Sequence, residues 1–204
     1  EKAALTEPLS VAEHCVGNRT SIKENDRVVV SGPGIIGILC AISARSRGAE
    51  VLVVGTEKDE QVRLSAAGEL GFRTLIVGQS HLPLHEQVEK QFPGGADALI
   101  EASGSPFALG DSWRSVRPDG VVTAVALYAR AIELDLTQFL RKQIDLRTSY
   151  ASSRADYNRA FELLRNGDVE SNILLSFYNL TEAEQGFADS ESLKVMKAMI
   201  NCQS

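Results

Sequence analysis

Apolar residues follow two alternating patterns along this chain. Short runs rich in Val, Ile and Leu are apolar at nearly every position, as in strands that are buried on both faces. These runs lie at residues 27–32, 50–55, 73–78, 97–102, 120–127 and 144–150. Between them, apolar or small residues recur at helical spacing at residues 35–48, 61–71, 106–116 and 156–167. The alternation predicts an α/β fold, a doubly wound parallel sheet of the Rossmann type with right-handed crossovers.

Both ends of the chain depart from this alternation. Near the N-terminus we expect one short helix over residues 7–18, with Thr6 as its N-cap and Pro8 in its first turn. The C-terminal end predicts an extended stretch, a helix and a final strand, at residues 172–180, 181–190 and 193–200. We expect residues 26–150 to form the sheet domain, and residues 1–25 and 151–204 to connect it to something beyond this chain.

Composition restricts the class of function. The chain has 204 residues, of which 44% are hydrophobic and 24% charged, as in ordinary globular domains with a sizeable core. The formal net charge is −6 and the acids are spread along the chain, which disfavours a nucleic-acid partner. No apolar run is long enough to span a membrane, and no segment resembles a secretory signal. The chain begins abruptly at Glu1, which suggests a piece of a longer protein.

Three cysteines, Cys15, Cys40 and Cys202, are far apart in the sequence. No Cys-x-x-Cys pair exists, so neither a zinc clip nor a disulfide framework is indicated. Free thiols in a reducing cytoplasm are the simplest interpretation, and we therefore expect a cytoplasmic protein.

Three glycines, Gly32, Gly34 and Gly37, form a G-x-G-x-x-G motif directly after the first predicted strand. Between a strand and a helix this spacing is typical of a dinucleotide site. The first glycine permits the tight turn, the second lets a pyrophosphate approach, and the third lets the helix pack against the strand. The N–H groups of the first helical turn, with Ile35 and Ile36, would then face the phosphates. The alternative is a turn that only connects strand to helix.

Other nucleotide classes fit this turn less well. A phosphoryl-transfer P-loop needs Lys followed by Ser or Thr after its glycines, and here the turn continues as Ile-Ile-Gly-Ile. A methyltransferase could use a similar turn for its methyl donor, and stays open as an alternative. The full three-glycine pattern favours a dinucleotide.

The second strand lacks the acid that usually follows such a turn. In NAD sites an Asp or Glu about twenty residues on binds the ribose 2′-hydroxyl, but Gly55 stands at the end of this strand. Without that carboxylate a 2′-phosphate is not repelled, and Thr56 and Lys58 could donate to it. We therefore expect NADP rather than NAD. Glu57 argues for NAD because it could supply the carboxylate, and Lys58 and Glu57 could also be two solvated loop charges.

Several segments together resemble the coenzyme-binding half of zinc-type medium-chain alcohol and polyol dehydrogenases, of the sorbitol and threonine dehydrogenase kind. The segments that carry the resemblance are ALTEPLSVAEHCV, VVVSGPGIIG, RLSAAGELGF, DALIEASGSPFAL, SVRPDGVVTAVALY and FELLRNGDVE. Their order and spacing cover nearly the whole chain. The segment VVGTEKD is also similar to family members in which Gly-Thr replaces the NAD-binding acid, and some of these use NADP.

The resemblance implies hydride transfer between an alcohol or polyol and a nicotinamide ring, with NAD or NADP as cofactor. A zinc ion would polarise the alcohol oxygen and lower its pKa, held by about three protein ligands. Most of these ligands belong to a preceding GroES-like catalytic domain that this chain does not contain, to which the flanking segments would connect. The catalytic residues are therefore expected outside this chain, which alone should bind the dinucleotide without turning over a substrate.

The resemblance also implies coenzyme contacts outside the turn. Ser103 and Gly104 follow the fourth strand, at whose carboxyl end such sheets bind ligands. The backbone that meets the nicotinamide amide corresponds to Val125, Ala126 and Leu127. Lys194 matches a basic position that approaches the pyrophosphate, and an exposed cation on an edge strand is an equal alternative.

Glu7 lies where polyol-type members carry a glutamate beside the zinc, and it is the metal-ligand candidate of this chain. Its alternative is an acid in a first helical turn, favoured by the helix dipole. His14 and Cys15 are adjacent and so point to different faces of a helix, which favours packing over metal binding. His81 and His85 are interpreted as parts of a polar loop rather than as a metal pair.

The sequence also predicts self-association, and it leaves two other functions open. Residues 121–136 could place a strand at the edge of the sheet, and open edges tend to pair, so we expect a homo-oligomer. The other expected partner is a small alcohol or polyol, with no nucleic acid and no membrane. A zinc-free enzyme of the quinone-reductase kind and a module that binds a dinucleotide without catalysis stay open as alternatives.

Overall fold

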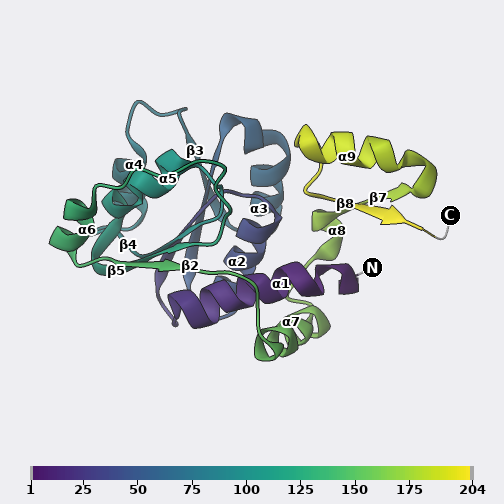
Figure 1. The fold of residues 1–204 in the computed structure, drawn as a ribbon, viewed down its shortest axis with the longest axis horizontal. Helices are drawn as coiled ribbons and strands as arrows, with labels where there is room; N and C mark the ends of the chain where they lie inside the picture. Colours follow the sequence, from purple (N-terminus) through teal and green to yellow (C-terminus); the bar gives the residue numbers. More distant parts are fainter. Residues whose placement is uncertain (1, 203–204) are drawn as a thin grey trace.

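A computed structural model describes residues 2–202, and a parallel sheet forms its centre (Figure 1). Within these residues the sheet has six strands in the order β3-β2-β1-β4-β5-β6. Their bounds are β1 Arg27–Ser31, β2 Glu50–Thr56, β3 Arg73–Val77, β4 Ala96–Glu101, β5 Val116–Ala124 and β6 Asp145–Thr148. The predicted doubly wound parallel sheet is confirmed. The strand order reverses between β1 and β4, which is the place where such sheets bind ligands.

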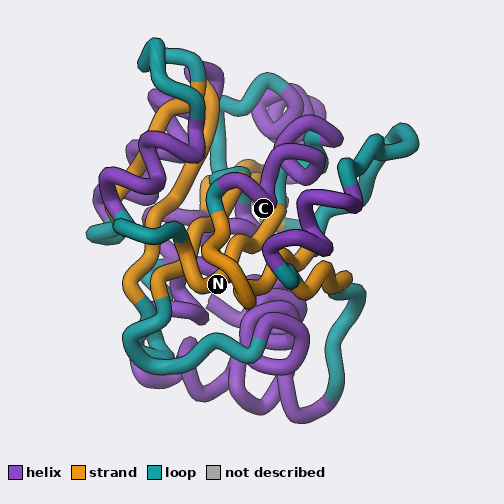
Figure 2. Tube along the Cα trace, turned by 90° about the vertical axis from the view of Figure 1, so that its left-hand side faces the viewer, coloured by secondary structure: helices purple, strands orange, loops and turns teal. Residues whose placement is uncertain are grey.

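Helices cover both faces of the sheet (Figure 2). The helices that flank it are α1 Thr6–Glu13, α2 Ile35–Arg45, α3 Ser65–Glu69, α4 Leu84–Gln91, α5 Pro106–Asp111, α6 Leu136–Lys142 and α7 Arg154–Asn166. Alternate residues of a strand enter two different cores. On β1, Val28 and Val30 belong to the core under α1, α2 and α7, whereas Val29 belongs to the core under α4, α5 and α6. None of the helices described between residues 2 and 202 is long and apolar enough to cross a membrane.

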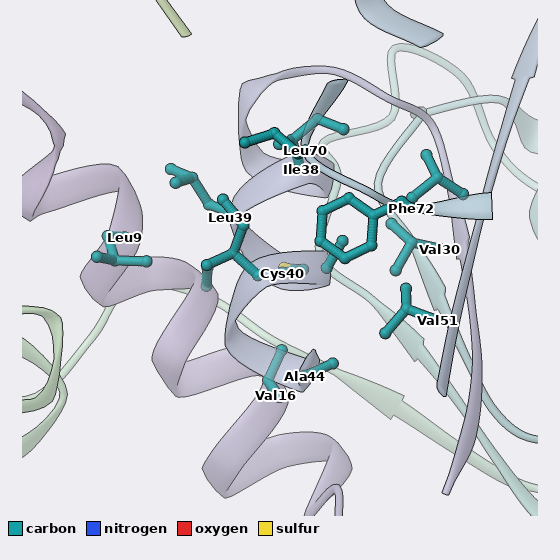
Figure 3. Close-up of a cluster of buried hydrophobic side chains, with 14 of the residues drawn as sticks. Leu9, Val16, Val30, Ile38, Leu39, Cys40, Ala44, Val51, Leu70 and Phe72 are labelled. Carbon is teal, nitrogen blue, oxygen red and sulfur yellow. The ribbon is translucent and has the colours of Figure 1, made fainter. Parts of the chain in front are cut away.

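The N-terminal helix is part of the first core (Figure 3). Figure 3 shows Leu9 beside Leu39 of α2, and Val16 beside Ala44 near the end of that helix. Leu9, Leu39 and Val16 are fully buried. Full burial of a large aliphatic side chain stabilises a fold by about 1.5–3 kcal/mol. The contact between α1 and α2 therefore contributes to the stability of the sheet domain itself.

The C-terminal part forms a separate two-stranded unit. β7 Leu175–Asn179 and β8 Lys197–Asn201 pair in parallel, and α9 Ala183–Glu191 connects them. Figure 1 shows this unit beside the main sheet, reached through the short helix α8 Ser171–Leu174. The expected extended stretch over 172–180 is therefore wrong at its start, where α8 lies. The expected final strand over 193–200 begins only at Lys197.

The predicted start of the first helix is wrong. A 3₁₀ helix, Lys2–Leu5, runs directly into α1, so the chain is already helical before Thr6. Thr6 is the first residue of α1 and not its cap, and its buried hydroxyl has no hydrogen-bond partner within the described residues. The helical path then continues as a π-helix, His14–Thr20, and ends at Ser21, whose φ is 62°.

Two predictions about the surroundings of the sheet are also wrong. β5 lies between β4 and β6, so residues 121–136 do not supply the edge strand, and β6 does. His85 lies on α4 rather than in a polar loop, whereas His81 lies in the bend before that helix.

Candidate functional site

The turn after β1 is built on glycine for steric reasons. Gly32 has a φ of 101°, a left-handed conformation that favours glycine. Its N–H donates to the carbonyl oxygen of Val54 over 2.8 Å, which ties the turn to the end of β2. A Cβ on Gly32 would lie 2.5 Å from the backbone nitrogen of Ser103. The turn thus packs directly against the loop that follows β4.

Gly37 and Gly34 meet different surroundings. A Cβ on Gly37 would collide with the carbonyl oxygen of Gly32, so α2 can pack against the turn only with glycine there. A Cβ on Gly34 would meet nothing within 4 Å. Gly34 is the N-cap of α2, with φ −68° and ψ 175°, and Ile35 and Ile36 begin the helix. Open space therefore lies beside a helix N-terminus, where backbone N–H groups and the helix dipole favour a phosphate.

Gly55 has a packing role at the end of β2. A Cβ there would lie 2.8 Å from Cγ of Pro33 and 3.1 Å from Cδ1 of Leu64. The glycine therefore lets the end of β2 approach the turn after β1. Its presence has a steric cause in addition to the absence of a carboxylate.

An acid is nevertheless present next to the end of β2. Asp59 is buried, and its Oδ2 accepts hydrogen bonds from the Thr56 backbone N–H over 2.9 Å and from the Thr56 hydroxyl over 2.8 Å. Its Oδ1 accepts from Nη1 of Arg63 over 3.3 Å. The Thr56 hydroxyl therefore already has an acceptor within the chain. Glu57 and Lys58 are exposed, and within residues 2–202 no ion pair involves Lys58.

Glu101 lies at the carboxyl end of β4 and is fully buried. Its Oε1 accepts from the backbone N–H and the hydroxyl of Ser103, the former over 2.9 Å. Its Oε2 accepts from the Gly104 N–H over 3.4 Å and from the Tyr128 hydroxyl. Burial raises the pKa of Tyr128 and the neighbouring Glu101 raises it further, so this hydroxyl stays protonated and donates. The carboxylate thus joins the loop after β4 to the loop after β5.

The loop after β5 closes against the same strand end. The carbonyl oxygen of Glu101 accepts from the backbone N–H groups of Val125 over 2.9 Å and Ala126 over 3.3 Å. A Cβ on Gly104 would lie 2.9 Å from the carbonyl oxygen of Leu127, whose side chain is 83% exposed. The turn glycines, Ser103, Gly104 and residues 125–127 therefore meet at one end of the sheet.

Lys194 and Glu7 have other surroundings. Lys194 lies in the turn between α9 and β8, and its Nζ is 3.4 Å from Oδ1 of Asp189. It is thus not on an edge strand. Glu7 is exposed on α1. Among residues 2–202 no group of three His, Cys, Asp or Glu side chains is placed to hold a metal ion.

His14 and Cys15 take part in packing and local hydrogen bonds. His14 Nδ1 lies 3.1 Å from Oδ2 of Asp156 on α7. Cys15 is fully buried, and all three cysteines are free thiols.

Two surface hollows lie away from the glycine turn. One, of about 230 Å³, is lined by residues near the amino ends of the strands, including Asp97, Arg117 and Arg147. The other, of about 410 Å³, lies beside β3 and includes Leu75 and Gln87. Neither lining contains the turn glycines.

Sequence reasoning missed Glu101, Tyr128 and Asp59. Glu101 ends an apolar strand, and its partner Tyr128 is 27 residues away, so no local pattern joins them. Asp59 had a detectable signal, because Thr followed three residues later by an acid is a capping pattern.

Known proteins similar to this chain were found by sequence and by fold. It is 33% identical to a sorbitol dehydrogenase of Halalkalibacterium halodurans, over 97% of this chain and 58% of that one. It is 32% identical to a 2-dehydro-3-deoxy-L-galactonate 5-dehydrogenase of Pseudoalteromonas atlantica, over 100% of this chain and 59% of that one. The chain thus spans less than three fifths of these relatives.

The fold is also similar to solved structures. That of 2R,3R-butanediol dehydrogenase from Bacillus subtilis has a TM-score of 0.88 at 22% identity, over 97% of this chain and 56% of that one. Residues 36–166 match the family model described as zinc-binding dehydrogenase. This match covers more than half of the chain and includes α2 from its second residue on, together with the strands from β2 to β6.

Proposed function

Because the chain belongs to the zinc-binding dehydrogenase family, we propose that it supplies the NAD(P)-binding surface of an alcohol or polyol oxidoreductase. The observation that carries this proposal is the open space beside Gly34 at the N-terminus of α2. A helix start with accessible N–H groups, held between the ends of β1 and β4, suits the pyrophosphate of a dinucleotide. The relatives named for sorbitol and for a sugar acid support a polyol-like substrate for the whole protein.

Each part of the site has a proposed role. The backbone around Gly34, Ile35 and Ile36 would bind the pyrophosphate. Ser103 and Gly104, together with the backbone of residues 125–127, would line the nicotinamide end. The bound coenzyme supplies the hydride donor or acceptor, while this chain binds and orients it.

A zinc site and the oxidation of a substrate need protein groups that residues 2–202 do not provide. We propose that Glu7 contributes at most one carboxylate to a zinc site whose other ligands lie outside this chain. The chain alone, supplied with zinc and coenzyme, should therefore not oxidise sorbitol. A homo-oligomeric assembly stays part of the proposal, with β6 as one of the two edge strands of the sheet. The three free thiols support a cytoplasmic location.

The proposed preference for NADP now rests on Lys58. Its ammonium group is exposed beside the end of β2 and forms no ion pair within residues 2–202. The Thr56 hydroxyl is a weaker candidate, because it donates to Asp59. Lys194 is also weaker as a pyrophosphate ligand, because it lies near Asp189.

The experiment is a calorimetric titration of this chain with NAD and with NADP. We expect both to bind and NADP to bind more tightly. Lys58→Ala should weaken NADP by about ten- to a hundredfold, the worth of one hydrogen bond to a charged group, and should leave NAD unchanged. Lys90→Ala, an exposed lysine on α4, is the matched control. Gly55→Asp is a poor probe, because its side chain would collide with Pro33.

Two results would contradict the proposal. Binding of neither dinucleotide would remove the proposed function as a whole. Equal binding of NAD and NADP, unaffected by Lys58→Ala, would remove the cofactor preference and leave dinucleotide binding in place.

A further inference from the structure

Glu101 carries a charge that the fold does not neutralise. The carboxylate is fully buried, and every hydrogen bond it receives comes from a neutral donor: two backbone N–H groups, the Ser103 hydroxyl and the Tyr128 hydroxyl. Within residues 2–202 no lysine, arginine or histidine forms an ion pair with it. Buried carboxylates usually have a cationic partner or a metal ion, because burial of an isolated charge costs free energy. A buried carboxylate without a cationic partner therefore needs a functional explanation.

The groups around the Glu101 carboxylate are arranged as donors. Each of its two oxygens accepts from a backbone N–H, and a backbone N–H cannot act as an acceptor. The Ser103 hydroxyl also accepts from the N–H of Ser105 over 3.1 Å, so it is oriented to donate to Glu101. Three of the four hydrogen bonds to Glu101 thus come from groups that are fixed as donors. The fold therefore holds a negative charge beneath the candidate site.

This charge lies under both loops assigned to the nicotinamide end. Ser103 and Gly104 bind its side chain, and Val125 and Ala126 bind its carbonyl oxygen. The Ser103 backbone in turn contacts the Gly32 turn. Salt screens a buried charge much less than an exposed one, so a charged ligand group on these loops would sense it.

We propose that Glu101 sets the relative affinity of the site for the two redox states of the coenzyme, its unpaired negative charge favouring the oxidised nicotinamide. The oxidised ring carries one positive charge and the reduced ring carries none, whereas the rest of the dinucleotide is the same. The inference rests on the proposed function and names the group that discriminates between the two forms. Glu101 acts through the electrostatic potential at the ring and does not need to touch it.

The test is a comparison of two dissociation constants in one variant. The Kd of NAD+ and the Kd of NADH are measured by calorimetry on this chain and on Glu101→Gln, at one pH and one salt concentration. Gln keeps the shape and one acceptor oxygen but removes the charge. We expect the ratio of Kd(NAD+) to Kd(NADH) to rise by about three- to thirtyfold, as for a unit charge lost several ångströms away in a medium of intermediate dielectric.

Two variants serve as controls. Tyr128→Phe removes a hydrogen bond but keeps the charge, so the ratio should not rise. Asp97→Asn removes an acid at the opposite end of β4, where Arg27 and Arg117 already neutralise it, and should leave the ratio unchanged. If Glu101→Gln does not fold, the double variant Glu101→Leu/Tyr128→Phe replaces it, because the Tyr128 hydroxyl, which would lose its acceptor, is then removed together with the charge.

The outcomes separate this inference from the proposed function. An unchanged ratio in a folded charge-removal variant, with both coenzymes weakened equally, would overturn the electrostatic role and leave Glu101 as a structural brace. Failure of the unmodified chain to bind either coenzyme would overturn the proposed function instead. A raised ratio in the charge-removal variant alone supports the inference.

Discussion

Gly34 and Gly37, three positions apart, are glycine for different reasons. At Gly37 an added Cβ would collide with the carbonyl oxygen of Gly32, a backbone atom that cannot move aside. At Gly34 an added Cβ would meet nothing within 4 Å, and the backbone angles of −68° and 175° are open to any residue. The fold therefore demands Gly37, whereas only a ligand would demand Gly34.

Alanine substitutions separate these two demands. Gly37→Ala should lower the free energy of unfolding by about 3 kcal/mol or more, as in severe overpacking, and lower the Tm by roughly 10 °C. Gly34→Ala should change the free energy of unfolding by less than about 1 kcal/mol. It should nevertheless weaken dinucleotide binding by about tenfold, since about 1.4 kcal/mol corresponds to that factor. Thermal unfolding and calorimetric titration measure the two effects, and unaltered binding by Gly34→Ala would contradict the assignment of the pyrophosphate.

Among single residues, a buried acid was the hardest functional candidate to identify from the sequence. The glycine motif could be identified from spacing alone, because Gly32 and Gly37 serve a turn and a helix start that follow the strand within a few positions. Glu101 could not, because Tyr128 approaches it only through the pairing of β4 with β5. Gly55 was identified at the right place but for an incomplete reason, since its contact with Pro33 requires the folded sheet.

Among the elements, those with strong local signals were predicted best. α7 begins after a capping box formed by Ser153 and Asp156 and ends at Gly167, whose φ is 85°. Both signals are visible in the sequence, and the predicted range of 156–167 differs from the observed helix by only a few residues.

Two helices escaped prediction for opposite reasons. α4 is mostly polar, and Val88 is the only apolar side chain within its bounds that is buried. α6 has several apolar residues, but Phe139 is buried while Leu136 and Leu140 are exposed. In neither helix do the apolar residues mark the face that packs on the sheet. Both helices depend on their packing against the sheet. A local sequence pattern does not contain this information.

The cap of α7 makes a prediction about pH. Burial raises the pKa of Asp156, but hydrogen bonds from the Ser153 hydroxyl and backbone N–H and the contact with His14 outweigh it, so the pKa lies below its usual value. A carboxyl group with a lowered folded-state pKa adds stability above its unfolded pKa of about 3.9, and this stability is lost as the pH falls through the folded value. The stabilisation by Asp156 should therefore be complete at neutral pH and decline below about pH 4.

Asp156→Asn tests this at the scale of the helix. It should lower the free energy of unfolding by about 1–2 kcal/mol at pH 7, the worth of an N-terminal cap. The difference from the unmodified chain should shrink between about pH 4 and pH 2. Glu162→Gln, in an exposed pair with Arg159 on the same helix, should change stability by less than about 1 kcal/mol. Urea unfolding across this pH range gives both values, and a difference that stays constant with pH would rule out the cap as its source.

At the scale of the whole molecule, the N-terminal segment joins the sheet domain. Leu5, Leu9, Ala12 and Val16 are fully buried in the same core as Val28 on β1. The division of the chain at residue 25 stays a prediction about the larger protein. In this chain α1 packs against both α2 and α7, as Figure 1 shows.

A buried ion pair reinforces that packing. Glu13 on α1 is 1% exposed, and its Oε2 lies 2.6 Å from Nη2 of Arg47, just beyond α2. Nε of Arg159 on α7 lies 3.9 Å from the same oxygen. Removal of Glu13 leaves the Arg47 guanidinium, which is only 20% exposed, without its carboxylate partner, and this costs more than loss of an exposed pair.

Glu13→Gln should therefore destabilise the whole molecule cooperatively. We expect a loss of about 3–5 kcal/mol in the free energy of unfolding and a fall of roughly 10 °C in the Tm. Glu50→Gln, which breaks the exposed pair between Glu50 and Arg73, is the matched control and should cost less than about 1 kcal/mol. Circular dichroism during heating should show a single transition shifted as a unit, because α1, α2 and α7 share one core. A separate early transition, with the Tm of the sheet unchanged, would mean that α1 is an appendage that melts independently.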